Sequence, residues 1–224
     1  MRLTEALAEL FFPTRCAGCE MPGALLCDRC RADLPRIDST GACPRCGAPF
    51  GYLVCTECWS REWAFEAALA VGSLEAPLAR TVVLHKDAGE RRLGQLLGAL
   101  AAEQVSGVWP GWAECVVYVP ATTAALRRRG FDHGRAIALS LGAELGVPVV
   151  DALHRTAARD QRRLGRVERE SNAAGTFLSV GSVSGRVLLS DDVFTTGSTL
   201  DAAAAVLLQS GAGAVRVCAV ARAW

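Results

Sequence analysis

The sequence contains no run of 18 or more apolar residues, so no transmembrane helix is expected. Its N-terminus also lacks the continuous apolar core of a secretory signal. Apolar residues recur there at helical spacing instead, which predicts an amphipathic helix over residues 1–13. Together these absences favour a cytoplasmic protein.

Neither sign of charge dominates the chain, whose formal net charge is +1. This balance hides a segregation, because residues 127–169 contain ten arginines and five acidic residues. That third of the chain therefore carries +5 and the remainder carries −4. A localised basic stretch suits a polyanionic small ligand at least as well as a nucleic acid. Lysine is almost absent, since Lys86 is the only one.

Aromatic residues are few, at 6%, but 51% of the residues are hydrophobic, which is ordinary for a globular core. With 224 residues, the chain is long enough for one full domain and a small additional module. Disulfides are rare in the cytoplasm, so the ten cysteines require another explanation. Cys115 and Cys218 lie in apolar segments and are expected in the core.

The other eight cysteines form four C-x-x-C knuckles, and two knuckles supply the four ligands of a tetrahedral structural zinc ion. The knuckles are separated by 7, 12 and 8 residues, and the longest gap reads as a connector. We therefore pair the first knuckle with the second and the third with the fourth, while a crossed pairing stays open. A disulfide cluster or an iron–sulfur cluster are the alternatives. The predicted zinc ligands are Cys16, Cys19, Cys27, Cys30, Cys43, Cys46, Cys55 and Cys58.

The charge of this Cys-rich module, residues 14–60, disfavours the binding of nucleic acid. Its charged side chains balance, and eight thiolates with two Zn²⁺ ions add a charge of −4. That charge disfavours phosphate binding, so the module is expected to dock onto the rest of the protein. Nearby aromatic residues are candidates for the contact surface: Phe50, Tyr52, Trp59 and Trp63.

Residues 62–224 alternate short apolar runs with helical patterns, which predicts a mostly parallel sheet with helices on both faces and ligands at its carboxyl edge. The expected strands cover residues 67–74, 115–119, 149–155, 176–180, 187–189 and 215–220. The expected helices cover residues 77–84 and 93–101, a segment ending near 146, and a segment from 200 to about 211.

Residues 187–200 are the stretch whose order by itself implies chemistry. Asp191 and Asp192 fall where the strand is expected to end, and the hydroxyl-rich turn 195–199 leads into a helix. Free N–H groups and the helix dipole hold a phosphate, while paired carboxylates hold the vicinal hydroxyls of a sugar. The stretch therefore predicts a site for a ribose 5-phosphate group.

This order of strand, acidic pair and T-T-G-x-T resembles the 5-phosphoribosyl 1-diphosphate (PRPP) motif of type I phosphoribosyltransferases. The chain also contains L-H-K-D-A-G ending at Gly89, V-P followed by R-G-F-D-H ending at His133, and L-H-R-T ending at Thr156. With the N-terminal knuckles, these motifs resemble the ComF family. That resemblance implies a double zinc ribbon joined to a phosphoribosyltransferase-like domain, and a link to DNA uptake in natural competence.

The resemblance implies PRPP with Mg²⁺ as ligand, two structural Zn²⁺ ions and an acceptor that stays unknown. It assigns catalytic positions to Asp191, Asp192 and Arg129, and PRPP-binding positions to Asp191, Asp192, Thr195, Thr196, Gly197, Ser198, Thr199 and Lys86. Asp132 and His133 depart from the family's common Asn-Gln, and residues 121–123 lack the polar or His residue that the family often has after the V-P pair.

Three functions stay open at this point. The first is phosphoribosyl transfer, for which the polar segment 155–172 is either a lid or a solvated helix. The second is a non-catalytic, nucleotide-binding adaptor of DNA uptake. The third is binding of single-stranded DNA by the basic stretch 127–169, which predicts an affinity that falls steeply with salt.

Overall fold

The computed structural model describes residues 13–49, 51, 53–156 and 176–224. The predicted N-terminal helix, most of the segment 155–172, and the side chains of Phe50 and Tyr52 lie outside these residues. Over the described part of the chain, no helix combines the length and the apolar character that crossing a bilayer requires.

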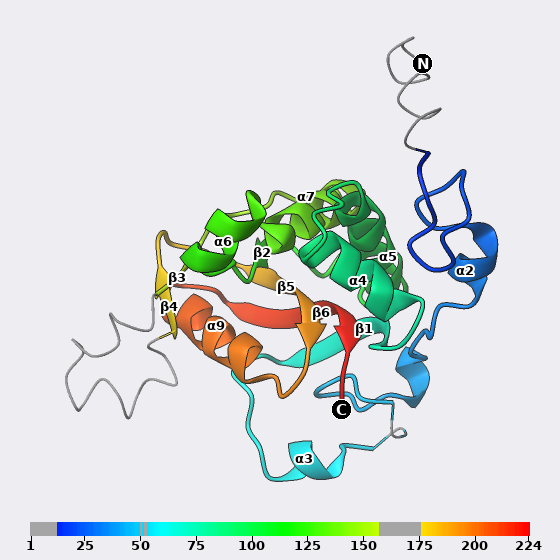
Figure 1. Ribbon diagram of the computed structural model, residues 1–224. Helices are drawn as coiled ribbons and strands as arrows, with labels where there is room; N and C mark the ends of the chain where they lie inside the picture. The colour runs from blue at the N-terminus through cyan, green and yellow to red at the C-terminus, as the bar shows by residue number, and fades with distance from the viewer. Residues whose placement is uncertain (1–12, 50, 52, 157–175) are drawn as a thin grey trace.

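A four-stranded parallel sheet forms the centre of the molecule, as the alternating sequence pattern predicted (Figure 1). From one edge to the other its strands are β1 (Ala67–Ser73), β6 (Ala214–Arg222), β5 (Arg186–Phe194) and β2 (Cys115–Tyr118). Because all four strands run the same way, their carboxyl ends meet at one edge.

Both faces of the sheet are covered, so the expected fold class is confirmed. Along β5, Leu188 points into one core and Leu189 into the other. Helices α4 (Leu78–Lys86), α5 (Leu93–Val108) and α7 (His133–Leu145) cover the Leu188 face. Helix α9 (Ser198–Gln209) and the third and fourth knuckles cover the opposite face (Figure 1). Cys115 and Cys218 are buried in these cores, as predicted.

Three parts of the α/β domain differ from the sequence predictions. Helix α6 (Thr123–Arg129) lies between the expected strand 115–119 and the helix expected to end near 146, where no separate helix was predicted. The strand expected over residues 149–155 is reduced to β3 (Leu153–Arg155) and a single bridge between Val149 and Val116. Strand β3 pairs antiparallel with β4 (Phe177–Ser179) in a separate two-stranded sheet.

The Cys-rich module contains the short helices α2 (Asp28–Ala32) and α3 (Thr56–Trp59) and one 3-10 turn, η1 (Ser39–Gly41). The connector between the second and third knuckles pairs with the free edge of β1. Ile37 N donates to Val71 O (3.1 Å), and Ser73 N donates to Pro35 O (2.8 Å). The predicted docking is therefore confirmed. Trp59 takes no part in it, since its side chain is 81% exposed, whereas Trp63 is packed against the core.

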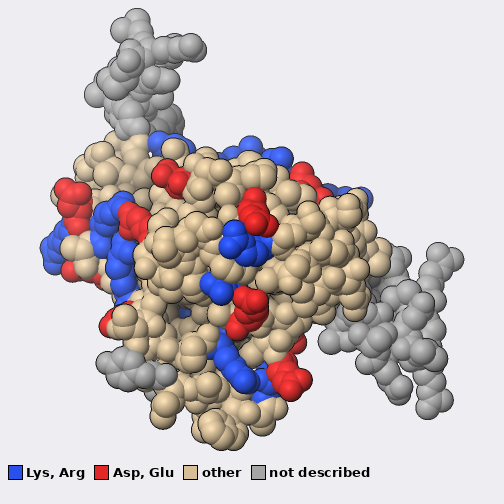
Figure 2. All heavy atoms as spheres, turned by 180° about the vertical axis from the view of Figure 1, so that it is seen from behind, with Lys and Arg blue, Asp and Glu red and all other residues tan. Residues whose placement is uncertain are grey.

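Arginine side chains on the surface are matched by acidic neighbours. On the face shown in Figure 2, basic and acidic side chains lie beside one another over the described residues. Glu103 accepts hydrogen bonds from both Arg31 and Arg36, and Arg216 lies 3.1 Å from Glu66. Such pairing weakens the field that these arginines offer to a distant polyanion.

Close packing of α5 against α7 yields a stability prediction. A Cβ added at Gly98 would lie 2.5 Å from the carbonyl oxygen of Ile137 and 2.5 Å from Cβ of Ser140. Gly98→Ala is therefore expected to lower the free energy of unfolding by about 1–3 kcal/mol through overpacking. Gly107 lies on the same helix with open space around it, so Gly107→Ala is expected to raise it by about 0.5–1 kcal/mol. Urea unfolding measures both, and equal effects would contradict the packing of these helices.

Candidate functional site

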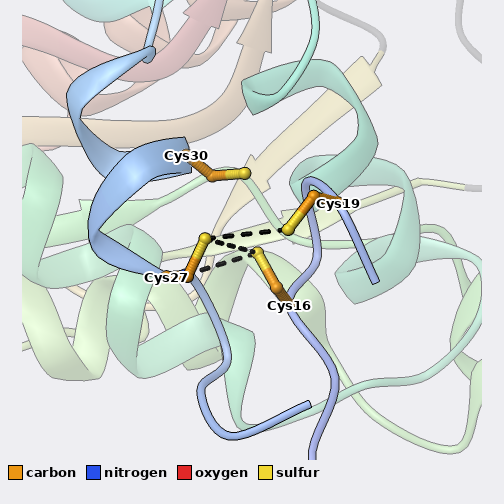
Figure 3. Close-up of side chains that lie close together, drawn as sticks. All are labelled: Cys16, Cys19, Cys27 and Cys30. Carbon is orange, nitrogen blue, oxygen red and sulfur yellow. Dashed lines mark hydrogen bonds between the residues drawn. The ribbon is translucent and has the colours of Figure 1, made fainter. Parts of the chain in front are cut away.

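Eight cysteines form two separate groups of four, which match the preferred pairing of knuckles and exclude the crossed one. In each group the four Sγ atoms lie within 4.8 Å of one another. Figure 3 shows the side chains of the first group, from residues 16–30, converging on one point. Sγ of Cys27 lies 3.6 Å from Sγ of Cys16 and 3.7 Å from Sγ of Cys19. A zinc tetrahedron with bonds of about 2.3 Å has edges of about 3.8 Å, so the spacing fits zinc.

Backbone N–H groups point at the sulfurs in the same way in both groups. Cys27 N lies 3.3 Å from Sγ of Cys16, and Cys55 N lies 3.4 Å from Sγ of Cys43. Burial raises the pKa of Cys16, but these donors outweigh it and lower that pKa to about 6. Burial and neighbouring sulfurs raise the pKa of Cys30 to about 12, so four thiolates form together only around a cation. Four protein ligands leave no open position, so both sites are structural.

The acidic pair lies within β5 and not after its end, because β5 continues to Phe194. Asp191 is still in register with Ala219 of β6. The expectation that the strand ends before the two aspartates is therefore wrong. The pair is nearly buried, with relative exposures of 8% for Asp191 and 4% for Asp192, because the ends of a neighbouring strand and of neighbouring helices surround it.

A cavity of about 360 Å³ opens at this carboxyl edge. It is lined by Lys86, Val119, Pro120, Ala121, Thr122, Ala125, Arg129, His133, Arg155, Asp191, Asp192, Val193, Thr195 and Thr199. Six predicted site residues therefore meet there: Lys86, Arg129, Asp191, Asp192, Thr195 and Thr199. The other three, Thr196, Gly197 and Ser198, form the tip of the adjoining turn and do not line the cavity.

The turn 195–199, which we call the hydroxyl loop, presents the start of α9. Gly197 has a left-handed backbone (φ 75°) and precedes the first helical residue, Ser198. The N-cap residue Gly197 has no side chain to cap this helix end, and Ser198 N donates only a long hydrogen bond to Oγ1 of Thr196 (3.5 Å). The first N–H groups of a helix have no partner within the helix, and the helix dipole adds positive potential there. The loop therefore has the chemistry of an anion site, as the sequence predicted.

Two cationic or donor groups converge on one oxygen of Asp192. Nζ of Lys86, the last residue of α4, lies 2.6 Å from Oδ2 of Asp192. Nε2 of His133, the first residue of α7, lies 3.2 Å from the same oxygen. Lys86 had been predicted only as a PRPP contact, and the structure shows that it also neutralises the acidic pair.

Arg129 fixes the protonation pattern of His133. Its Nη1 lies 3.2 Å from Nδ1 of His133, and its Nη2 donates to Oδ1 of Asp87 (2.9 Å). A guanidinium group cannot accept a hydrogen bond, so Nδ1 of His133 must be the acceptor. The proton of the neutral ring is then on Nε2, which donates it to Asp192. The order of contacts is Asp87, Arg129, His133, Asp192 and Lys86.

The two aspartates share one charge. Burial and then the adjacent charge of Asp192 raise the pKa of Asp191 well above its ordinary value. Burial alone would also raise the pKa of Asp192, but the hydrogen bond from His133 and the charge of Lys86 outweigh it and hold that pKa below its ordinary value. Asp192 is therefore the member of the pair that ionises first, and Asp191 holds its proton to higher pH.

Sequence reasoning missed three contributors to the cavity. His133 was noted as a departure from the family pattern, and the structure places its Nε2 3.2 Å from Oδ2 of Asp192. Arg155, at the end of β3, lines the cavity, although it had been considered only as one of the ten arginines of the basic stretch 127–169. Asp132 caps α7 by accepting from Arg135 N (3.1 Å) and tethers the wall of the cavity by accepting from Ala121 N (2.9 Å). The R-G-F-D-H motif, which contains Asp132 and His133, was the feature of the sequence from which the roles of these two residues could have been predicted.

Comparisons with known proteins agree with this arrangement. The family model of the double zinc ribbon domain matches residues 7–59. DNA utilization protein YhgH of Escherichia coli K12 is 30% identical over 223 residues, which cover 93% of this chain and 96% of that protein. Competence protein F of Haemophilus influenzae is 26% identical, covering 95% of this chain and 99% of that protein. Competence protein ComFC of Bacillus subtilis is also 26% identical, covering 86% and 82%.

Solved structures with similar folds include two whose names refer to phosphoribosyl groups. The glutamine PRPP amidotransferase of B. subtilis is 22% identical with a TM-score of 0.43, covering 56% of this chain and 25% of that chain. The adenine phosphoribosyltransferase of Leishmania tarentolae is 15% identical with a TM-score of 0.38, covering 62% and 74%. These TM-scores are too low to bear on function.

The sequence and structure thus define a class of protein, a double zinc ribbon followed by an α/β domain with a polar cavity at its carboxyl edge. Within that class the near full-length match to YhgH is decisive. The chain belongs to the ComF family, as the resemblance in the sequence predicted.

The unequal aspartates yield a pH prediction. The raised pKa of Asp191 means that stability falls as pH rises above about 4, where the unfolded state releases its proton. Asp191→Asn removes this loss, so its free energy of unfolding relative to the wild type is expected to increase from pH 5 to pH 8.

Asp192→Asn is expected to lower the free energy of unfolding by about 1.5–3 kcal/mol at pH 7, because charged hydrogen bonds to Lys86 and His133 are lost.

The depressed pKa of Asp192 reverses the sign of its own pH dependence. Its contribution is present above about pH 4 and disappears as pH falls through its folded pKa, so the deficit of Asp192→Asn shrinks in acid. Urea unfolding measures these differences, at pH 5 and pH 8 for Asp191→Asn against the wild type and at about pH 3 and pH 5 for Asp192→Asn against the wild type. A constant difference between Asp191→Asn and the wild type would show that Asp191 is not the protonated member.

Proposed function

We propose that the cavity at the carboxyl edge binds PRPP and that the protein is a phosphoribosyltransferase of unknown acceptor. One observation carries the proposal: a single cavity joins the Asp191–Asp192 pair to the uncapped start of α9 and to the cations Lys86 and Arg129. The pair suits vicinal hydroxyls, the helix start suits a phosphate, and the cations suit a pyrophosphate. Few small metabolites other than an activated ribose phosphate combine these three groups.

The protonation of the aspartates suits a diol. An ionised carboxylate accepts hydrogen bonds, whereas a protonated one both donates and accepts. Asp192 would thus accept from one ribose hydroxyl, and Asp191 would accept from or donate to the other. Because Asp192 is held by Lys86 and His133, its orientation is set before the ligand arrives, which reduces the entropy lost on binding.

In the proposed reaction the bond between C1 of the ribose and the pyrophosphate oxygen breaks, and pyrophosphate leaves with the electron pair. A lone pair of the acceptor forms the new bond to C1. Positive charge grows on the sugar and negative charge on the leaving group, so each fragment needs a fixed counter-charge. Asp192 supplies the first, and Lys86 and Arg129 supply the second. Nε of Arg129 is buried without a partner among the described residues, which leaves a donor for a pyrophosphate oxygen.

Magnesium enters this scheme as part of the substrate. The groups of metal-ligating side chains found among the described residues are the two sets of four cysteines, and no carboxylate cluster joins them. Asp192 already accepts from Lys86 and His133 through Oδ2. We therefore propose that Mg²⁺ arrives bound to pyrophosphate oxygens, whose charge it lowers for the leaving step.

The names of the relatives favour a role connected with DNA as the second candidate. They are a DNA utilization protein and two competence proteins. We propose that the same cavity serves a process of DNA uptake, either by catalysis or as a nucleotide-binding adaptor. Arg127 and Arg128 on the exposed side of α6 are the described part of the basic stretch available to a DNA backbone.

Calorimetry with PRPP and Mg²⁺ tests the proposal. The wild type is expected to bind PRPP more tightly than ribose 5-phosphate, because only PRPP engages Lys86 and Arg129. Lys86→Met is expected to weaken PRPP binding about 10- to 100-fold, which corresponds to about 1.4–2.8 kcal/mol. The exposed histidine of β3 supplies a control, since His154→Gln leaves the cavity unchanged.

The outcomes separate the candidate functions. Absence of binding to PRPP, ribose 5-phosphate and ATP would count against every nucleotide-linked proposal. PRPP binding that is lost in Lys86→Met, together with DNA uptake that persists in cells carrying this variant, would show that uptake does not depend on the cavity. A mobility shift of single-stranded DNA that weakens steeply with salt would instead support direct DNA binding.

The contact between His133 and Asp192 makes a separate prediction. A glutamine side chain can accept from Arg129 through its oxygen and donate to Asp192 through its nitrogen, as His133 does. His133→Gln is therefore expected to keep PRPP affinity within about threefold. His133→Leu has similar bulk but no donor, and is expected to weaken affinity about tenfold, which is about 1.4 kcal/mol. If the two variants bind PRPP equally well, the hydrogen bond to Asp192 does not position the acidic pair.

A further inference from the structure

The short linker between the fourth knuckle and β1, residues 61–65, connects the second cysteine group to the hydroxyl loop. We propose that Trp63 is a positioning residue through which metal in the second cysteine group holds the hydroxyl loop in place. The first cysteine group has no such effect. This inference deepens the proposed function, because the loop is the expected binding site of the 5-phosphate.

The first contact joins Trp63 to a metal ligand. The indole N–H of Trp63 lies 3.2 Å from Sγ of Cys58, a fully buried ligand of the second group. An indole nitrogen can only donate, and a metal-bound thiolate is a good acceptor. The position of Cys58 therefore fixes the position of the ring. When the four sulfurs are not drawn together by a cation, this acceptor is no longer held.

The second contact joins the ring to the hydroxyl loop. A Cβ added at Gly197 would lie 2.7 Å from Cη2 of Trp63 and 2.5 Å from Cε2 of Phe194, so the loop backbone rests directly on both rings. The rings of Trp63 and Phe194 meet edge to face at 6.1 Å, and Trp63 stacks on Phe65 at 5.0 Å. The ring of Trp63 thus supports the loop from below, and only a glycine permits this approach.

Neighbours of Trp63 hold the same loop from the side. The guanidinium of Arg61 stacks 3.7 Å above the ring of Trp63, and its Nη1 donates to Thr196 O (3.2 Å). Ala64 N donates to Oδ1 of Asp201 in the first turn of α9 (2.8 Å). The linker is therefore bonded to the loop tip and to the helix start, and both move with it.

The first cysteine group is attached elsewhere. It lies against α4, where Arg80 donates through Nη1 to Gly18 O (3.1 Å) and pairs with Glu20. The contacts described for this group reach α4, and none of them reaches residues 194–201. The two groups have matching local structure, since Cys27 precedes α2 as Cys55 precedes α3. The first cysteine group therefore serves as a control for variants in the second cysteine group of the same chain.

Three variants test the proposal. Cys55→Ser and Cys27→Ser each remove one ligand at equivalent positions and are each expected to reduce the zinc content from two ions per chain to about one. Hydrogen exchange of the amides in residues 195–201 is expected to become at least tenfold faster in Cys55→Ser and to stay within twofold in Cys27→Ser. Trp63→Phe removes the N–H and also the outer ring atoms that contact Gly197, and is expected to retain both zinc ions with about threefold faster exchange.

PRPP affinity provides the second readout. Cys55→Ser is expected to bind PRPP with Mg²⁺ at least tenfold more weakly than Cys27→Ser. Faster exchange without any PRPP binding by the wild type would support the positioning role and overturn only the proposed ligand. Equal exchange in Cys55→Ser and Cys27→Ser would overturn the positioning role. If Cys55→Ser does not fold, Trp63→Phe decides: unchanged exchange overturns the proposal, and faster exchange with both zinc ions retained supports it.

Discussion

Two carboxylates on consecutive residues of a buried strand cannot both be ionised without a partner, and the architecture around the cavity answers this constraint. Three helix ends meet at Asp192 and its neighbours: α4 ends at Lys86, α6 ends at Arg129 and α7 begins at His133. Each brings a donor that the strand itself lacks. These helix ends therefore offset the cost of burying the acidic pair, and the same residues line the cavity.

The same arrangement explains why the pair is useful as well as tolerated. Lys86 and His133 both contact Oδ2 of Asp192, and Arg129 holds His133 in one tautomer. Asp192 is thus charged and fixed, whereas Asp191 releases its proton only at higher pH and accepts from the backbone N–H of Asp192 (2.8 Å). Two chemically identical side chains acquire different properties from their surroundings, which is typical of functional sites.

The parts that could be predicted from sequence are those encoded by local spacing. The knuckles gave the eight ligands and their pairing, alternating patterns gave the parallel sheet, and the turn after β5 gave the loop before α9. The contacts to Asp192 could not be predicted, because Lys86 is 106 residues away and nothing in local pattern specifies such a meeting. The end of β5 was misjudged for a related reason: two aspartates disfavour a strand by themselves, and only their distant partners make it stable there.

The support beneath Gly197 bears on why a zinc module is joined to this sheet. The hydroxyl loop consists of small residues, and its glycine leaves no side chain to anchor it. Rigidity must therefore come from outside the loop, and the rings of Trp63 and Phe194 supply it from below. Phe194 belongs to the sheet, but Trp63 belongs to a linker of a few residues that has no regular structure of its own. Such a linker holds a ring only if its other end is fixed, and a closed four-sulfur metal site is a compact means of fixing it.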